Sequence, residues 1–213
     1  MARRFFDYLR KELKQLWAAL QETYQEVVVL VVACLALSLN RYHPTLVYSH
    51  RVTDFALYFC FPLLMGVLLL EKWPWEFGLR LGDYRQWGFH VLVSSLVIVP
   101  ATIAMSYDPA SAAYYGGMWS TPEEVIGDVA GLLWWEFLFR GFILFGLLPR
   151  LGKAAIIVRM VPFVLMHLGK PELETVLCIP MGLYYGYVAM IGKSMIPAFL
   201  IHIIINVTTF LAS

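Results

Sequence analysis

Long apolar runs separated by short polar connections dominate the hydrophobic pattern of this chain. Seven runs are candidate membrane-crossing helices, at residues 26–39, 53–70, 87–105, 124–148, 154–167, 175–191 and 194–211. A helix needs about 20 mostly apolar residues to cross the hydrocarbon core of a bilayer. The first and fifth runs are short, so we expect these helices to be tilted, extended at one end or only partly inserted. The pattern predicts an all-α membrane protein, a polytopic bundle of about seven transmembrane helices.

The first 24 residues follow a different pattern. Their basic side chains alternate at helical spacing with Phe5, Phe6, Leu9, Leu13, Leu16 and Trp17. This spacing predicts an amphipathic helix that lies in the membrane interface; a polar extension of the first span is the alternative. The segment is rich in charge and has no apolar core, so no cleavable signal peptide is expected. We therefore divide the chain into an interfacial helix at residues 1–24 and a membrane domain at 25–213.

Lys and Arg are unevenly distributed between the connections. With seven spans, the side of the N-terminus carries 12 of them, Arg159 included. The opposite side carries 3, and Arg140 is left inside the membrane. Because positive connections favour the cytoplasm, we expect a cytoplasmic N-terminus, in the plasma membrane of a prokaryote.

Composition supports a lipid environment and excludes one class of partner. The chain is 60% hydrophobic and 15% charged, whereas a soluble domain is about half apolar and a quarter charged. The lipid bilayer is therefore the expected surrounding. Its net charge is only +1, and it has neither a basic stripe nor a P-loop, so no nucleic acid partner is expected.

Glu136 and Arg140 interrupt the most apolar of the predicted spans. Ionisable residues inside a span are costly and are candidates for function. Their spacing of four places both on one helix face. Arg140 stays charged, so Glu136 is expected to be an ionised carboxylate. The pair belongs either to a structural contact between helices or to a reactive site.

Two further spans carry polar groups. His167 ends an apolar run, where an interfacial anchor or a partner of the helix dipole is the ordinary interpretation. His202 and Asn206 are four apart in the last span, where hydrogen bonding between helices is the ordinary interpretation. A carboxylate and an imidazole can together activate a water molecule. A second histidine and an asparagine can stabilise the resulting oxyanion.

The depths of these groups are partly compatible with one site. At about 1.5 Å per residue, Glu136 lies roughly 18 Å from the outer end of its helix and His202 roughly 12 Å from the inner end of its own. The two depths add up to a bilayer core of about 30 Å. His167 fits less well, because it lies at the outer end of its run. A re-entrant or tilted fifth helix would be needed to bring it to the others.

The three polar motifs occur in the order of a known family. Glu136–Arg140, Phe163–His167 and His202–Asn206 resemble the EExxxR, FxxxH and HxxxN motifs of the CPBP family. This family comprises type II CAAX prenyl proteases and bacteriocin-processing enzymes, and is also called abortive-infection-like. The connecting segments FGLRLGDYRQWG from Phe77 and GLYYGYVAMIGKSMIPAFLIHIIIN from Gly182 resemble it too. The resemblance covers about residue 75 to the C-terminus, with the motif core at residues 122–213.

The resemblance implies an intramembrane endopeptidase of the glutamate type. Its substrate would be a peptide or protein at the membrane, and no metal or cofactor would be needed. By resemblance, the first Glu of the pair and His167 activate water, and His202 and Asn206 form the oxyanion hole. Arg140 would orient Glu136, and Phe163 would support the site.

The chain departs from the family at Trp135. Arg140 fixes the alignment, so Glu136 matches the second Glu of EExxxR, and an aromatic residue stands where the family has its catalytic carboxylate. Three explanations remain open. Glu136 does the chemistry itself, Glu174 or Glu172 supplies the carboxylate, or the protein is a non-catalytic membrane scaffold or immunity protein. Glu172 and Glu174 have an ordinary interpretation as charges at a helix start.

Two other functions are less favoured by the pattern. Two histidines and a glutamate could bind zinc in an open catalytic site, but the chain contains no HExxH. A transporter built from inverted repeats would show matching spans interrupted by Pro or Gly. No such repeat is evident.

Overall fold

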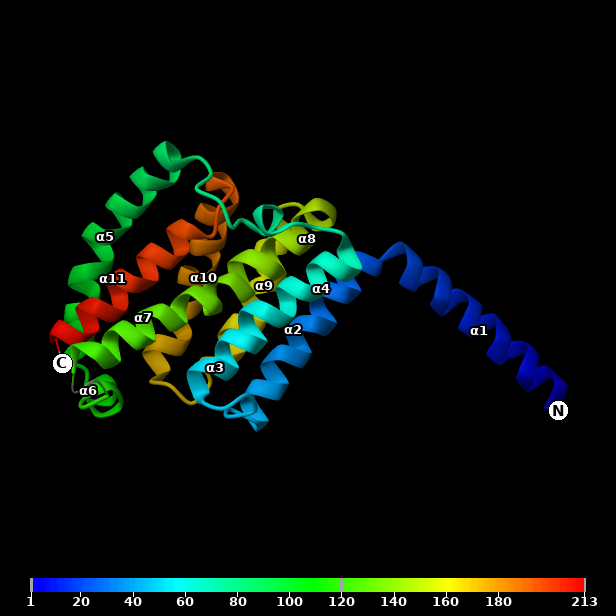
Figure 1. Cartoon of the computed structure of the whole chain (residues 1–213), viewed down its shortest axis with the longest axis horizontal. Helices are drawn as coiled ribbons and strands as arrows, with labels where there is room; N and C mark the ends of the chain where they lie inside the picture. The colour runs from blue at the N-terminus through cyan, green and yellow to red at the C-terminus, as the bar shows by residue number, and fades with distance from the viewer. Residues whose placement is uncertain (1, 119–120, 213) are drawn as a thin grey trace.

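The computed structural model describes residues 2–118 and 121–212, and within them the chain is helical with no strand (Figure 1). The helices are α1 (Ala2–Glu22), α2 (Tyr24–Tyr42), α3 (His50–Phe55), η1 (Ala56–Cys60), α4 (Phe61–Leu70), η2 (Pro74–Phe77), α5 (Tyr84–Ser106), α6 (Pro109–Tyr115), α7 (Pro122–Glu136), η3 (Phe137–Ile143), α8 (Leu144–Leu151), α9 (Ala154–Leu165), α10 (Glu172–Gly192) and α11 (Ile196–Ala212). The predicted all-α fold is confirmed.

Each predicted span has a helix at its place. Among the described residues, five continuous helices are long and apolar enough to cross a membrane: α2, α3–η1–α4, α5, α7–η3–α8 and α10. The fifth and seventh runs form the shorter apolar helices α9 and α11. Of the options for the short first run, the structure shows extension, because α2 continues the apolar run at both ends to 19 residues. The fifth helix is short as expected, with 12 residues.

The helix that contains α7, η3 and α8 forms the centre of the bundle. In an apolar stretch of 18 residues of this helix 72% of the residues are buried, whereas in the corresponding stretch of α5 only 6% are buried. All seven residues of the π-helical segment η3 are buried, as expected for a helix that is apolar around most of its circumference. At Gly146 this helix approaches α2 so closely that a Cβ atom would lie 2.7 Å from Val29. A small residue at this point lets the two helices pack directly.

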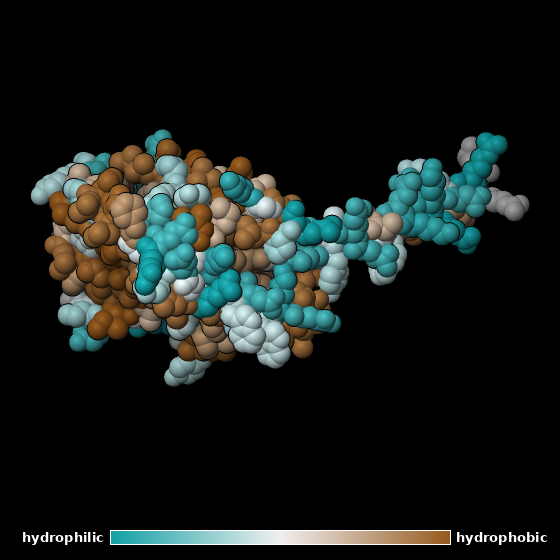
Figure 2. Space-filling view, turned by 90° about the horizontal axis from the view of Figure 1, so that it is seen from above, coloured by the Kyte–Doolittle hydropathy of each residue, from teal (hydrophilic) through white to brown (hydrophobic). Residues whose placement is uncertain are grey.

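Helix α5 lies at the edge of the bundle. It packs mainly against α11, and less extensively against α10 (Figure 1). The connection after it turns through the short helix α6, whose N-terminus is capped by Asp108. Because α5 buries so little of its surface, its apolar side chains form part of the hydrophobic exterior of the bundle (Figure 2).

Helix α1 extends away from the bundle (Figure 1). Its described side chains, Arg4–Glu22, are all exposed. The junction with α2 is held by Arg150, which donates to the carbonyl oxygen of Glu22 at 2.7 Å and pairs with Glu26 at 3.1 Å. The side of α1 seen in Figure 2 is mainly hydrophilic, in contrast to the bundle.

Candidate active site

The ion pair expected from the sequence forms in the core. Arg140 Nη1 donates to Glu136 Oε1 at 3.0 Å, and both side chains are completely buried. Glu136 is the last residue of α7, and Arg140 lies in η3. The second oxygen, Oε2, has no hydrogen-bond partner among the described residues. Because arginine stays charged, the pair holds an ionised carboxylate in the apolar interior.

The same carboxylate binds the histidine of the last span. His202 Nδ1 lies 2.7 Å from Glu136 Oε1, so the contact ties α11 to the central helix. An ionised carboxylate only accepts hydrogen bonds, which assigns the hydrogen of this contact to Nδ1. The predicted grouping of Glu136, Arg140 and His202 is therefore present in the structure.

His167 reaches the site from a turn. Helix α9 ends at Leu165, so His167 lies just beyond the fifth helix and not inside it. Its Nδ1 is 2.8 Å from the carbonyl oxygen of Phe163, and its own carbonyl oxygen accepts from Thr175 Oγ1 at 2.9 Å. A carbonyl oxygen only accepts, so this histidine too carries hydrogen on Nδ1. His167 lines the same cavity as His202, while the expected tilt or re-entry of the fifth helix stays a prediction.

Glu174 forms a second ion pair at the start of α10. Lys170 Nζ lies 2.8 Å from Glu174 Oε1, and the hydroxyl of Tyr115 donates to Glu174 Oε2 at 2.6 Å. Lys170 also donates to that hydroxyl at 3.4 Å. Burial, followed by the bond to Glu174, raises the pKa of Tyr115, so the hydroxyl keeps its hydrogen. These contacts connect α6 to α10.

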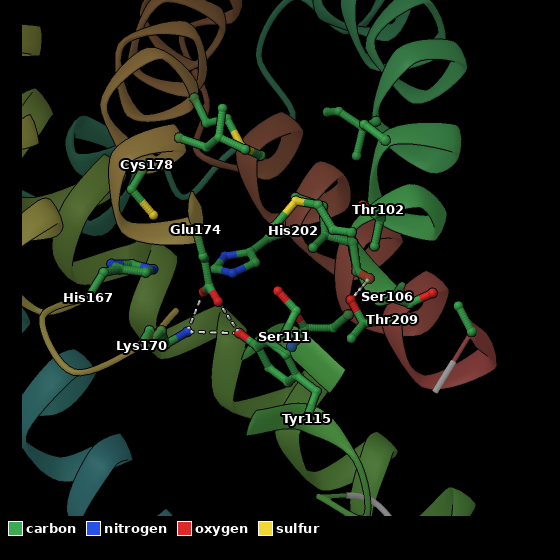
Figure 3. A pocket seen from close by; sticks show the side chains of 18 of the residues that line it. Thr102, Ser106, Ser111, Tyr115, His167, Lys170, Glu174, Cys178, His202 and Thr209 are labelled. Atoms are coloured by element: carbon green, nitrogen blue, oxygen red, sulfur yellow. Dashed lines mark hydrogen bonds and ion pairs between the residues drawn. The ribbon is translucent and has the colours of Figure 1, made fainter. Parts of the chain in front are cut away.

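A cavity of about 390 Å³ brings most of the predicted residues together (Figure 3). It lies between α5, α6, α10, α11 and the turn after α9. Its wall is mainly apolar, and its polar groups include His167, Lys170, Glu174, His202, Asn206 and Tyr115. Figure 3 shows the side chains of His167, Glu174 and His202 directed into this space. One cavity therefore offers two imidazoles, a carboxylate and a carboxamide.

Four residues singled out from the sequence lie outside the described lining of this cavity: Trp135, Glu136, Arg140 and Glu172. Glu136 touches the cavity residue His202 but is itself completely buried. Glu172 is exposed in the first turn of α10. Of the carboxylates considered from the sequence, Glu174 is the one found in the cavity wall.

Trp135 packs against His167. Its ring meets the His167 ring edge to face, with 6.2 Å between centroids, and lies 4.8 Å from the Phe139 ring. The indole nitrogen has no hydrogen-bond partner among the described residues. At the position where the resemblance expects a carboxylate, the chain has an aromatic wall beside His167.

Phe163 lies between two buried guanidinium groups. The Arg140 group is 4.1 Å from the ring centroid and the Arg159 group 5.8 Å, within the usual range of cation–π contacts. Arg159 is completely buried and donates to the carbonyl oxygen of Gly182. Counting Arg159 with the cytoplasmic charges was wrong, because it lies in the middle of α9 and points into the core. In the sequence, the spacing of four between Arg159 and Phe163 was the signal that both lie on one face of the helix.

Within residues 2–118 and 121–212, no three His, Cys, Asp or Glu side chains are grouped to hold a metal ion. The expectation of a site without metal stays a prediction.

Comparison with known proteins finds a similarity in the C-terminal part of the chain. Residues 125–208 match the family model described as "Type II CAAX prenyl endopeptidase Rce1-like". The match spans all three motifs and confirms the resemblance to the CPBP family. No curated protein and no solved structure matches the chain. The chain is therefore an integral membrane protein whose residues 125–208 are similar to the Rce1-like CAAX endopeptidases.

Proposed function

We propose that this protein is an intramembrane endopeptidase that cleaves a membrane-associated peptide or protein with a water molecule activated by Glu and His. One observation carries the proposal: His167, Glu174, His202 and Asn206 line a single cavity. An enclosed, largely apolar cavity with a few convergent polar groups is the usual form of a catalytic site. The family of residues 125–208 supports the same class of reaction.

In this proposal Glu174 takes over the place of the carboxylate that Trp135 replaces. Glu174 and His167 hold the attacking water, and both face the cavity. The carboxamide of Asn206 faces the carbonyl oxygen of the scissile bond, and the ring of His202 lies in the same cavity wall. Arg140 supports the site through its ion pair with Glu136, and Phe163 supports it by packing against Arg140. Glu136 is too enclosed to touch a substrate directly.

A peptidase assay with matched variants tests this assignment. Full-length protein in lipid nanodiscs is incubated with a mixture of lipid-anchored peptides of varied sequence, and products are identified by mass spectrometry. Glu174→Gln and His167→Ala should each reduce cleavage on the order of 10²-fold, because the attacking water loses a group that positions it. Glu172→Gln is the control, because this neighbouring glutamate is exposed and should leave the rate unchanged. Cleavage that survives both changes would show that the site lies elsewhere.

A non-catalytic scaffold or immunity protein is the second candidate. It is favoured by Trp135 and by the engagement of both oxygens of Glu174 with Lys170 and Tyr115. Trp135→Glu separates the two candidates, because it restores the carboxylate beside His167. If the wild type is inactive and the variant cuts peptides, the natural protein is a binder. A wild type that already cuts, with no gain from the variant, excludes the binder.

We further propose that α1 lies in the membrane interface on the cytoplasmic side of a prokaryotic plasma membrane, as a unit separate from the domain at residues 25–213. Its apolar face is formed by Phe5, Phe6, Leu9, Leu13, Leu16, Trp17 and Leu20. Tryptophan fluorescence on vesicles reports its insertion, using a peptide of residues 1–24 that carries Trp17 alone. A blue shift is expected for this peptide and not for its Leu9→Ser, Leu13→Ser variant. Equal spectra would contradict the interfacial placement.

A further inference from the structure

The cavity contains three groups that can accept the proton of an attacking water: Glu174, His167 and His202. The three groups differ in the hydrogen-bond partners that hold each of them. The identity of the proton acceptor follows from those partners, and it deepens the proposed function, on which it rests.

Both oxygens of Glu174 already accept a hydrogen bond. Lys170 donates to one oxygen at 2.8 Å, and Tyr115 donates to the other at 2.6 Å. The remaining lone pairs can hold and orient a water molecule. This arrangement assigns Glu174 to holding the water and leaves the two histidines as candidates for taking its proton.

The two histidines line the cavity, and in each the Nδ1 atom is bound to a partner, but the two partners differ. In both, Nδ1 carries the hydrogen, so the neutral ring has a bare Nε2 that can accept a proton. The Nδ1 of His167 donates to a neutral carbonyl oxygen, that of Phe163. The Nδ1 of His202 donates to the buried carboxylate of Glu136. A negative group at 2.7 Å in an apolar interior stabilises the imidazolium that forms when Nε2 is protonated.

Arg140 completes the environment of His202. It keeps Glu136 ionised, so that the carboxylate cannot itself donate to Nδ1. The imidazolium that forms when Nε2 takes a proton therefore has a fixed counter-ion.

We propose that His202 takes the proton of the attacking water and that Glu136 is its positioning residue. The water oxygen bonds to the carbonyl carbon as its proton moves to Nε2, and the carbonyl π pair moves to the oxygen. When the C–N bond breaks, its electron pair goes to nitrogen, and the imidazolium returns the proton to that nitrogen. The ring is neutral again, and the new carboxyl group releases its proton to solvent. A histidine supported by a carboxylate thus does the work of the carboxylate absent at Trp135.

Nitrogen NMR on ¹⁵N-histidine-labelled protein in nanodiscs tests the positioning role independently of activity. The signals of His202 are identified by their loss in His202→Gln. In the wild type we expect the neutral ring to be protonated on Nδ1. In Glu136→Gln the amide can donate to Nδ1, so protonation should shift to Nε2, while the signals of His167 stay in place. Glu174→Gln is the matched control and should leave the form of His202 unchanged.

Kinetics on the same proteins test the proton transfer. Glu136→Gln should lower kcat on the order of 10²–10⁴-fold, because the ring is in the wrong form. KM should change by less than about twofold, since Glu136 does not touch the substrate. If Glu136→Gln does not fold, Glu136→Asp keeps the charge, should retain the Nδ1 form and should lower kcat less. The wild-type spectrum tests the Nδ1 form of His202 even if neither Glu136 variant folds.

The outcomes separate this inference from the proposed function. A wild type that cuts peptides while Glu136→Gln keeps its kcat, or whose neutral His202 is protonated on Nε2, overturns the inference alone. A wild type that cuts no peptide overturns the proposed function, and the proton transfer with it.

Discussion

Two glutamates in this protein each pair with a cation four residues away, yet the two pairs lie in opposite environments. Glu136–Arg140 has an N–O distance of 3.0 Å and both side chains 0% exposed. Lys170–Glu174 has a shorter distance, 2.8 Å, with side chains 32% and 18% exposed. The first lies behind the cavity, and the second forms part of its wall. The same spacing in the sequence therefore does not imply the same role in the structure.

The difference teaches that burial determines what each pair can do. Buried ions that have lost their hydration depend on each other, so removing one leaves an uncompensated charge. Partly exposed ions retain solvent and gain little from pairing. The enclosed pair is suited to holding His202 in place, and the cavity pair is free to meet a substrate.

The largest expected effect comes from removing the cation of the buried pair. Arg140→Met should lower the free energy of unfolding by about 3–5 kcal/mol, because Glu136 would be left buried and unpaired. Unfolding in mixed micelles, followed by circular dichroism, measures the loss. Lys170→Met is the matched variant and should cost less than about 1 kcal/mol. Similar losses in the two variants would remove the distinction between the pairs.

The third contact of the cavity pair should have an intermediate effect. Tyr115→Phe removes the hydroxyl that donates to Glu174 and keeps the ring. We expect a loss of about 0.5–1.5 kcal/mol, the usual net value of one hydrogen bond. The same unfolding experiment measures it. A loss as large as that of Arg140→Met would mean that the cavity pair is as dependent on its partners as the buried pair.

A pair on the outside of the bundle should have the smallest effect. Arg51 and Asp128 are 3.8 Å apart, with side chains 60% and 46% exposed. Arg51→Ala should change the free energy of unfolding by less than about 0.5 kcal/mol. This variant sets the lower end of the scale in the unfolding series. A change above 1.5 kcal/mol would indicate that exposure is a poor guide to the strength of ion pairs here.

The sequence predicted more of the fold than of the site. Apolar runs of near-membrane length located each spanning helix, because a bilayer imposes length and hydrophobicity on every span. Helical spacing likewise predicted the Glu136–Arg140 pair. The sequence predicted that His202 and Glu136 lie in the same site, but not that they are in direct contact. That contact depends on how α11 packs against α7.

Other features of the site could not be obtained from spacing. Tyr115 and Glu174 are 59 residues apart, and only the path of the chain around α6 brings them together. The cavity position of Glu174, in contrast to the exposed Glu172, follows from the direction in which α10 begins. Such directions are set by packing between helices, for which a single sequence has no local signal.

The location of Glu136 and Arg140 on one continuous helix has a consequence for how the protein enters the membrane. An isolated ionised side chain near the centre of a span costs about 2.5–3.5 kcal/mol during insertion. Partners within one span can neutralise each other as soon as that helix forms, before any neighbouring helix arrives. Arg159 has no such partner in α9 among the described residues, and its bond to Gly182 waits for α10, which is synthesised later. The last steps of biogenesis should therefore be the ones that stabilise α9.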